Sequence, residues 1–253
     1  MVDFGKTAED YRQHRAGFPP ELLDRLAGFG VGGPGQRLLD VGTGTGTLAR
    51  QFAQRGAVVT GIDPAAPMLV QARALDAEAG VSVTYLEGKA EAVPLPNGSF
   101  DAITAGQCWH WFDRPKAAAE MHRLLVPGGR MVIAHFDWLP LPGSLVAATE
   151  ALILNFNPAW RFAGGTGIYP AWFEDLSCAG FTGLESLSFD LAVPYTPAAW
   201  VGRIRASAGV AASLPPEEVA RFSDALTALL AADFPGDSLL VPHRVWALVG
   251  RRG

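Results

Sequence analysis

The feature that most constrains the fold is an alternation of short apolar runs with helical stretches. Between residues 37 and 136, five runs have the length and composition of buried strands, and helical patterns separate them. Right-handed crossovers place such helices on both faces of a sheet. With two later strand candidates, the pattern predicts an α/β fold, namely a Rossmann-like, doubly wound, mostly parallel seven-stranded sheet. Ligands are expected at the carboxyl ends of its strands.

The individual elements can be assigned from the same periodicities. The expected strands are 37–41, 58–63, 81–87, 100–105, 130–136, 184–193 and 245–250. The expected helices are 20–29, 48–54, 67–79, 116–125, 198–208 and 217–232. The alternation stops between 137 and 179, where tryptophans stand among Gly and Pro residues, and we interpret this stretch as an insertion that covers the sheet edge.

The bulk composition limits the classes of partner. The chain has 253 residues and a formal net charge of -5. Its only Lys/Arg run is the pair Arg251 and Arg252, so it has no basic stripe that could follow a phosphate backbone, and no nucleic-acid partner is expected. Cys108 and Cys178 lack disulfide or metal-ligand spacing, so no metal is expected and a cytoplasmic location fits. The first residues do not resemble a signal peptide and no apolar stretch is long enough to span a bilayer, so no membrane association is expected.

A glycine-rich turn follows the first expected strand. Gly42, Gly44 and Gly46 lie where the strand passes into a helix, and glycine lets backbone and ligand approach closely there. The spacing is G-x-G-x-G, with Thr47 where a dinucleotide motif requires glycine, which argues against NAD or FAD. Asp63 ends the second strand, where a carboxylate can accept hydrogen bonds from two ribose hydroxyls. An isolated glycine triplet could be a tight loop alone, but this series predicts a nucleoside-type ligand.

Four segments resemble the motifs of class I S-adenosylmethionine-dependent methyltransferases with a type 11 domain. They are DVGTGTG (Asp40–Gly46), GIDPAAPML (Gly61–Leu69), GKAEAVPLPNGSFD (Gly88–Asp101) and RLLVPGG (Arg123–Gly129). They occur in the order and at the spacing of the family. A fifth segment, AGQCWHWFD (Ala105–Asp113), is similar to the trans-aconitate methyltransferase-like branch. The resemblance implies S-adenosyl-L-methionine as the cofactor and S-adenosyl-L-homocysteine as its product.

The resemblance also implies residue roles in the cofactor site. The backbone of the glycine turn would face the methionine moiety, and Asp63 would hold the ribose. The adenine would lie between Pro64 and Met68. Lys89 stands where many relatives have an acidic residue, which leaves the two positions after it as candidates for the adenine amine. The full set is Arg15, Asp40, Gly42, Thr43, Gly44, Gly46, Asp63, Pro64, Met68, Ala90, Glu91 and Gln107.

The resemblance implies one domain over residues 1–253, with an inserted helical cap. An N-terminal lid and linker (1–35) precedes the cofactor-binding core (36–136). The substrate cap would consist of 137–179 and 194–240, and the final strands of 180–193 and 241–253.

Candidate residues for chemistry lie after the fourth expected strand. His110 could remove a proton from the acceptor, contact the substrate or anchor its loop, and it is the tentative catalytic residue. His135, which ends the fifth strand, is either a second candidate or a core histidine. Cys108 is interpreted as packing, since a sulfonium donor needs no covalent intermediate. The tentative substrate set is Trp109, His110, His135, Trp138 and Arg203.

These patterns together predict an enzyme that transfers a methyl group to an oxygen, nitrogen or carboxylate of a small, partly apolar metabolite. In-line displacement at a sulfonium depends mainly on positioning and needs no metal. Two alternatives stay open: an enzyme that uses the cofactor in a non-methylating rearrangement or cyclisation, and a non-catalytic, cofactor-binding regulatory protein. The acceptor and the oligomeric state are left open as well.

Overall fold

The computed structural model describes residues 17–253, which divide into two compact units. The sheet unit contains Gly17–His135, Tyr169–Ser188 and Val245–Gly253. The helical unit contains Phe136–Ile168 and Phe189–Arg244. Each unit has a hydrophobic core of its own.

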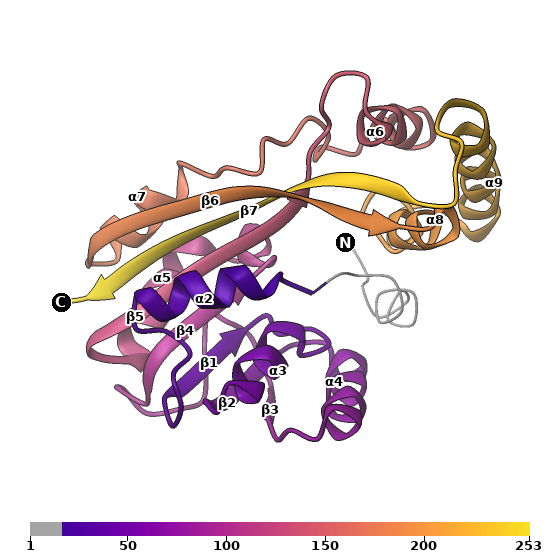
Figure 1. Cartoon of the computed structure of the whole chain (residues 1–253). Coiled ribbons are helices and arrows are strands. Elements are labelled where there is room, and N and C mark those ends of the chain that lie inside the picture. Colours follow the sequence, from indigo (N-terminus) through magenta and orange to yellow (C-terminus); the bar gives the residue numbers. More distant parts are fainter. Residues whose placement is uncertain (1–16) are drawn as a thin grey trace. The chain divides into compact units, whose positions relative to one another are not determined.

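A seven-stranded sheet is the central element of the fold (Figure 1). Its order is β3-β2-β1-β4-β5-β7-β6, and the four ladders β2–β3, β1–β2, β1–β4 and β4–β5 are parallel. This confirms the predicted mostly parallel sheet. The strands are β1 (Arg37–Val41), β2 (Val58–Asp63), β3 (Thr84–Glu87), β4 (Phe100–Gly106), β5 (Leu125–Trp138), β6 (Phe181–Tyr195) and β7 (Leu239–Arg252).

The last three strands are longer than the apolar pattern predicts. β5 begins at Leu125, which pairs with Phe100 of β4 before a register shift, and β7 begins at Leu239. Pro127, Gly128 and Gly129 in β5 and Pro242 in β7 interrupt the apolar pattern, so the sequence predicts a later start for both strands. The expected strand from residue 81 is instead shortened, since β3 begins only at Thr84.

The helices follow the predicted ranges within a few residues, with two additions. They are α2 (Pro20–Gly28), α3 (Thr47–Gln54), α4 (Ala66–Ala79), α5 (Arg114–Leu124), α6 (Leu145–Phe156), α7 (Trp172–Cys178), α8 (Pro197–Arg205) and α9 (Pro216–Asp233), with a 3-10 turn, η2 (Trp109–Trp111). The additions are α6 and α7, which lie within the stretch 137–179, where the sequence pattern predicts no individual helix. A signal for α6 is present, because the Ser144 hydroxyl accepts from the Ala147 N–H and so caps its first turn.

Helices α3 and α4 pack beside the first strands of the sheet unit. α3 contacts β1 and β2, and α4 contacts β2 and β3 (Figure 1). The buried face of α4 contains Met68, Ala72 and Asp76, which are spaced four residues apart. The amino end of each helix therefore follows the carboxyl end of a strand, where the predicted cofactor residues lie.

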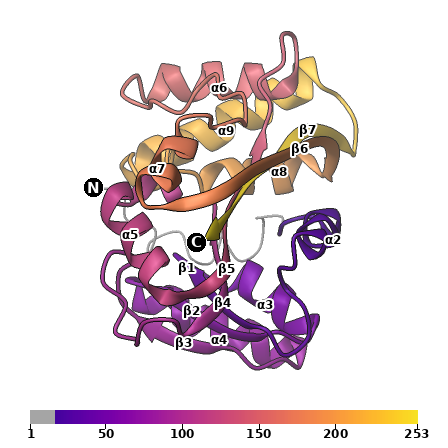
Figure 2. The same cartoon turned by 90° about the vertical axis from the view of Figure 1, so that its left-hand side faces the viewer.

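In the helical unit, α6, α8 and α9 form one layer of packed helices. α9 contacts both α6 and α8, and both views show the three together (Figures 1 and 2). Their core contains the fully buried side chains of Trp200 and Phe222. Within residues 17–253, no helix combines the length and the apolar character that crossing a bilayer requires.

Candidate functional site

The glycine turn joins β1 to α3 at the carboxyl edge of the sheet. Gly42, Gly44 and Gly46 have φ angles of 62°, 55° and 72°, a left-handed backbone that side chains other than glycine rarely adopt. Gly46 is also the residue that caps α3. The amino end of α3, whose first N–H groups have no carbonyl partner within the helix, therefore begins directly at the turn.

The three glycines meet different surroundings. A Cβ atom at Gly42 would lie 2.8 Å from Cβ of Cys108, and one at Gly46 would fall on the hydroxyl of Tyr85. A Cβ atom at Gly44 would meet no atom of the described residues within 4 Å. Gly42 and Gly46 therefore make room for protein side chains, whereas Gly44 leaves open space that a ligand can occupy.

Asp63, the last residue of β2, is bonded to the glycine turn. Its Oδ2 accepts from the Gly44 N–H at 2.9 Å, and its Oδ1 accepts from the Ala65 N–H at 2.9 Å. Burial raises the pKa of Asp63, and these two N–H groups oppose that rise. A carboxylate has further lone pairs on both oxygens, so Asp63 can still accept from two ligand hydroxyls. The open space and this carboxylate fit a ribose-bearing cofactor.

Asp40 supports the turn from within the sheet. Its carboxylate is buried and accepts from the hydroxyls of Thr43 at 2.6 Å and Thr104 at 2.7 Å. Burial raises its pKa to about 6, against the effect of both hydroxyls. Asp40 therefore acts on the site through Thr43, and a direct cofactor contact of either residue stays a prediction.

The predicted adenine residues lie on segments that follow β2 and β3. Pro64 is exposed, whereas Met68 and Ala90 are buried, each about 4% exposed. The Glu91 carboxylate accepts from the backbone N–H of Asp113 at 2.9 Å, so it links its loop to the start of α5. The adenine contacts of these residues stay predictions.

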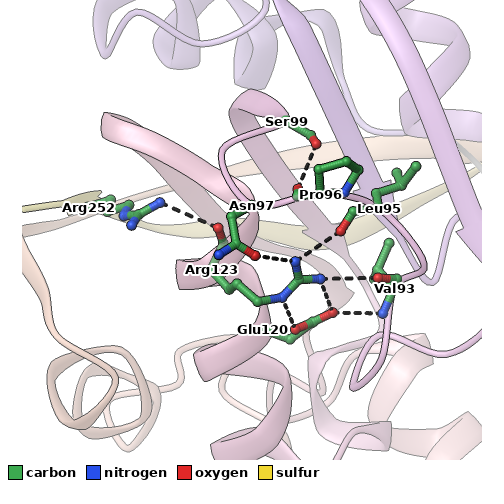
Figure 3. A network of polar contacts seen from close by, with 8 residues as sticks. All are labelled: Val93, Leu95, Pro96, Asn97, Ser99, Glu120, Arg123 and Arg252. Carbon is green, nitrogen blue, oxygen red and sulfur yellow. Dashed lines mark hydrogen bonds and ion pairs between the residues drawn. The ribbon is translucent and has the colours of Figure 1, made fainter.

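Arg123 holds residues 93–97 of the loop that follows this segment, a role that the sequence pattern does not predict (Figure 3). Its guanidinium donates to both oxygens of Glu120, each at 2.7 Å. It also donates to the carbonyls of Val93 and Leu95 and to the side chain of Asn97. Five donors in one plane let arginine cross-link a loop in this way. The available signal was its place in the RLLVPGG segment.

The backbone at the end of β4 is strained. Gln107 has a φ of 62° although it is not glycine, and its N–H donates to the Ala134 carbonyl at 2.9 Å. Such strain is commonly found at functional sites, where the fold imposes it. The next residue, Cys108, is buried and its thiol donates to the Val41 carbonyl at 3.1 Å. This geometry agrees with the packing role predicted for Cys108.

The structure brings the two candidate histidines together. The ring centres of His110, in η2, and His135, in β5, are 5.3 Å apart. His135 is buried, and its ring lies 4.5 Å from Tyr169 and 4.9 Å from Trp172. His110 is only half-buried. Of the two, His110 is the one that solvent or a substrate can reach.

The predicted substrate residue Trp109 lies in the core of the sheet unit. Its side chain is fully buried, and its indole N–H donates to the Asp175 carboxylate at 3.0 Å. Arg114 donates to the same carboxylate oxygen at 3.1 Å. Trp109 therefore anchors η2 to the segment of α7, and its predicted substrate contact has no support in this geometry.

Two other predicted substrate residues belong to the helical unit. The Arg203 guanidinium lies 4.9 Å from the centre of the Trp138 ring, and the Trp138 indole donates to Glu150 at 2.8 Å. Burial lowers the pKa of Arg203, while Tyr195 and Asp137 oppose this effect. The predicted cofactor residue Arg15 lies outside the described residues.

Comparisons with known proteins agree with this site. Residues 39–133 match a family model described as "Methyltransferase domain". An uncharacterized methyltransferase of Mycobacterium bovis is 38% identical over 130 residues, which cover 51% of this chain and 50% of that protein. The demethylmenaquinone methyltransferase of Thermus thermophilus is 41% identical over 133 residues, which cover 46% of this chain and 60% of that protein. The matching region contains the glycine turn and Asp63.

The crystal structure of the YcgJ protein of Bacillus subtilis has a similar fold. Its TM-score is 0.61 at 21% identity, over 92% of this chain and 99% of that one. At this identity the likeness shows the fold alone. The sequence match covers about half the length of the curated relatives.

Proposed function

We propose that the chain is a class I S-adenosylmethionine-dependent methyltransferase that methylates a small metabolite, a proposal supported by the match of residues 39–133 to a methyltransferase domain. S-adenosyl-L-methionine is the cofactor of this family, and S-adenosyl-L-homocysteine is the product that it leaves. The acceptor would be an oxygen, nitrogen or carboxylate of a partly apolar molecule. Its similarity to the trans-aconitate branch stays a prediction.

One observation carries the proposal: Gly44, where an added Cβ would meet no described atom within 4 Å, donates its backbone N–H to the Asp63 carboxylate. The Gly44 N–H donates to Asp63 at 2.9 Å, so the turn and the ribose-binding carboxylate are held in one arrangement before the cofactor binds. A preformed site loses less conformational entropy on binding. Glycine at position 44 permits the left-handed φ of 55° and adds no side chain to this space.

The chain's own residues would mainly bind and orient. Asp63 would accept from the ribose hydroxyls, and the backbone around Gly44 would face the methionine moiety. When bound, the cofactor supplies an electrophilic methyl group on a positively charged sulfur. Gln107 would contact the cofactor, because it follows β4 at the carboxyl edge of the sheet. His110 would bind the acceptor or hold the proton that it releases.

The name of one relative supports a small acceptor. The Thermus relative is named for a reaction on demethylmenaquinone, a small molecule. The acceptor contacts expected for Trp138 and Arg203, which belong to the helical unit, stay predictions.

Calorimetric titration tests the cofactor assignment. We expect S-adenosylmethionine and S-adenosylhomocysteine to bind the wild-type protein at micromolar concentrations, and Asp63→Ala to weaken both at least tenfold. Asp101→Asn is the matched control, because Asp101 pairs with Arg37 at the opposite ends of β1 and β4. The cofactor assignment is wrong if neither ligand binds, or if Asp63→Ala binds as the wild type does.

A second measurement tests the transfer itself. The protein would be incubated with S-adenosylmethionine and a panel of small apolar acids, phenols and amines, and the release of S-adenosylhomocysteine would be followed. Equal amounts of methylated product and S-adenosylhomocysteine are expected. A product formed without S-adenosylhomocysteine would favour a rearrangement or cyclisation, and tight cofactor binding with no turnover of any acceptor would favour a regulatory protein.

A further inference from the structure

A buried polar cluster lies behind the glycine turn, on the side of the protein interior. Arg50 in α3 donates through Nε to the Asp76 carboxylate in α4 at 2.8 Å. Its Nη2 donates to the carbonyl of Thr45 at 2.8 Å and to that of Ala72 at 3.4 Å. One guanidinium therefore connects the turn itself with the helix that follows β2.

This ion pair is unusually well buried. The side chains of Arg50 and Asp76 are 13% and 4% exposed, whereas those of the Arg37–Asp101 pair are 48% and 33% exposed. Withdrawing two charges from water is costly, and apolar side chains of the same size often stabilise a fold as well as a buried pair does. Fold stability alone is therefore a weak explanation for the presence of this ion pair. The bond from Arg50 to the Thr45 carbonyl offers a specific explanation, namely that the pair holds the turn.

Tyr85 completes the cluster from β3. Its hydroxyl lies beneath Gly46, and its ring lies beneath Gly61, where a Cβ atom would be 2.7 Å from Cε1. Burial and the neighbouring Asp76 carboxylate raise the pKa of Tyr85, so the phenol stays neutral. The ring is held between two backbone segments and therefore limits how far the turn can move inward.

We propose that Arg50, Asp76 and Tyr85 form a clamp that sets the conformation of the Thr45–Gly46 peptide and so the affinity for the cofactor. The inference rests on the proposed function of the glycine turn. Arg50 holds the turn by its carbonyl, Asp76 orients Arg50, and Tyr85 supports Gly46 from below. All three are positioning residues: Arg50 and Tyr85 contact the turn from the interior, and Asp76 acts through Arg50.

The physical basis is preorganisation. Three left-handed glycines give the turn many accessible conformations, and only some of them leave the space at Gly44 open. Binding to a protein that is competent only part of the time weakens the apparent affinity by that fraction. If the clamp raises the competent fraction from about a tenth to nearly all, its loss weakens binding about tenfold.

The decisive variant is the double substitution Arg50→Met/Asp76→Leu. It removes the bond to Thr45 without leaving an uncompensated buried charge, so we expect the melting temperature to stay within a few degrees of the wild type. We expect the dissociation constant for S-adenosylhomocysteine, measured by calorimetry, to rise at least tenfold. Arg37→Met/Asp101→Leu is the matched control, which removes a pair at the opposite strand ends and should leave this constant unchanged.

Two conservative variants keep the inference testable if the double variant does not fold. Arg50→Lys keeps a charge opposite Asp76 but loses the planar fork, so its affinity should fall several-fold with little change in melting temperature. Tyr85→Phe removes only the hydroxyl beneath Gly46 and should weaken binding less. These two variants also show whether affinity and stability respond separately, which a purely structural role would not produce.

The outcomes separate the clamp from the function on which it rests. If the wild type binds S-adenosylhomocysteine and the folded variants bind it within twofold, the clamp inference is overturned and the proposed function stands. The clamp inference is also overturned, and the proposed function again stands, if the affinity of the variants falls only in proportion to their loss of stability. If the wild type binds neither S-adenosylhomocysteine nor S-adenosylmethionine, the proposed function fails and the clamp fails with it.

Discussion

Substituting Gly46 by alanine should mainly lower stability, whereas substituting Gly44 by alanine should mainly weaken cofactor binding, although both glycines belong to one motif. Both positions have a left-handed backbone, which costs an alanine about 1–2 kcal/mol. At Gly46 the added methyl would also fall on the Tyr85 hydroxyl and lie 3.2 Å from Cβ of Ala72. Overpacking of this kind costs a further 1–3 kcal/mol or so. A methyl added at Gly44 would meet no described atom within 4 Å, so no such cost arises.

We therefore expect Gly46→Ala to lower the free energy of unfolding by about 2–5 kcal/mol, and Gly44→Ala by only about 1–2 kcal/mol. The effects on binding should be reversed, since the methyl at Gly44 would enter the space assigned to the cofactor. A tenfold loss of S-adenosylhomocysteine affinity, about 1.4 kcal/mol, is the least effect expected for Gly44→Ala.

The assay combines urea unfolding, followed by tryptophan fluorescence, with calorimetric titration of S-adenosylhomocysteine. Tyr85→Leu in the Gly46→Ala background is the internal check, because removing the obstructing hydroxyl should recover part of the lost stability. The reasoning is refuted if Gly44→Ala binds the ligand like the wild type, or if both alanine variants lose equal stability.

Three further predictions concern the supports of the site. Burial raises the pKa of Asp40 to about 6, so the folded state binds a proton at this carboxyl more tightly than the unfolded state does. The resulting stability is fully present below about pH 4 and is lost as the pH rises through about 6, a change of about 3 kcal/mol that Asp40→Asn should abolish in pH-dependent urea unfolding. Gln107→Gly should relieve the strain at φ 62° and raise the free energy of unfolding by about 1 kcal/mol, while calorimetry shows weaker cofactor binding; unchanged affinity would remove Gln107 from the site. Arg123→Met should lower the free energy of unfolding by about 2 kcal/mol or more, because Glu120 and two loop carbonyls lose their donor, and faster proteolysis within residues 93–99 would reveal the released loop.

The path from β1 through the glycine turn to α3 and β2 was readable from sequence alone. Its determinants are local: a short, continuously buried strand, glycines where the backbone becomes left-handed, and a helix with an apolar face. Asp63 could be placed because the carboxyl ends of neighbouring parallel strands share one edge of the sheet. Backbone geometry links these features within one stretch of the chain, so a single sequence predicts them.

The side-chain partners were decided by the tertiary structure. Asp76 is in phase with the buried face of α4, which is a signal that could have been noticed, but its partner Arg50 belongs to another helix. Trp109 was expected to line a substrate site, and the fold instead buries it against Asp175.

The sequence by itself therefore determined the sheet, the turn and the position of Asp63 at the end of β2. The tertiary structure decided what each glycine makes room for: Cys108 at Gly42, Tyr85 at Gly46, and open space at Gly44. The physical reason is that backbone conformation depends on neighbours along the chain. The free volume at a Cβ position depends instead on side chains that packing brings from distant segments.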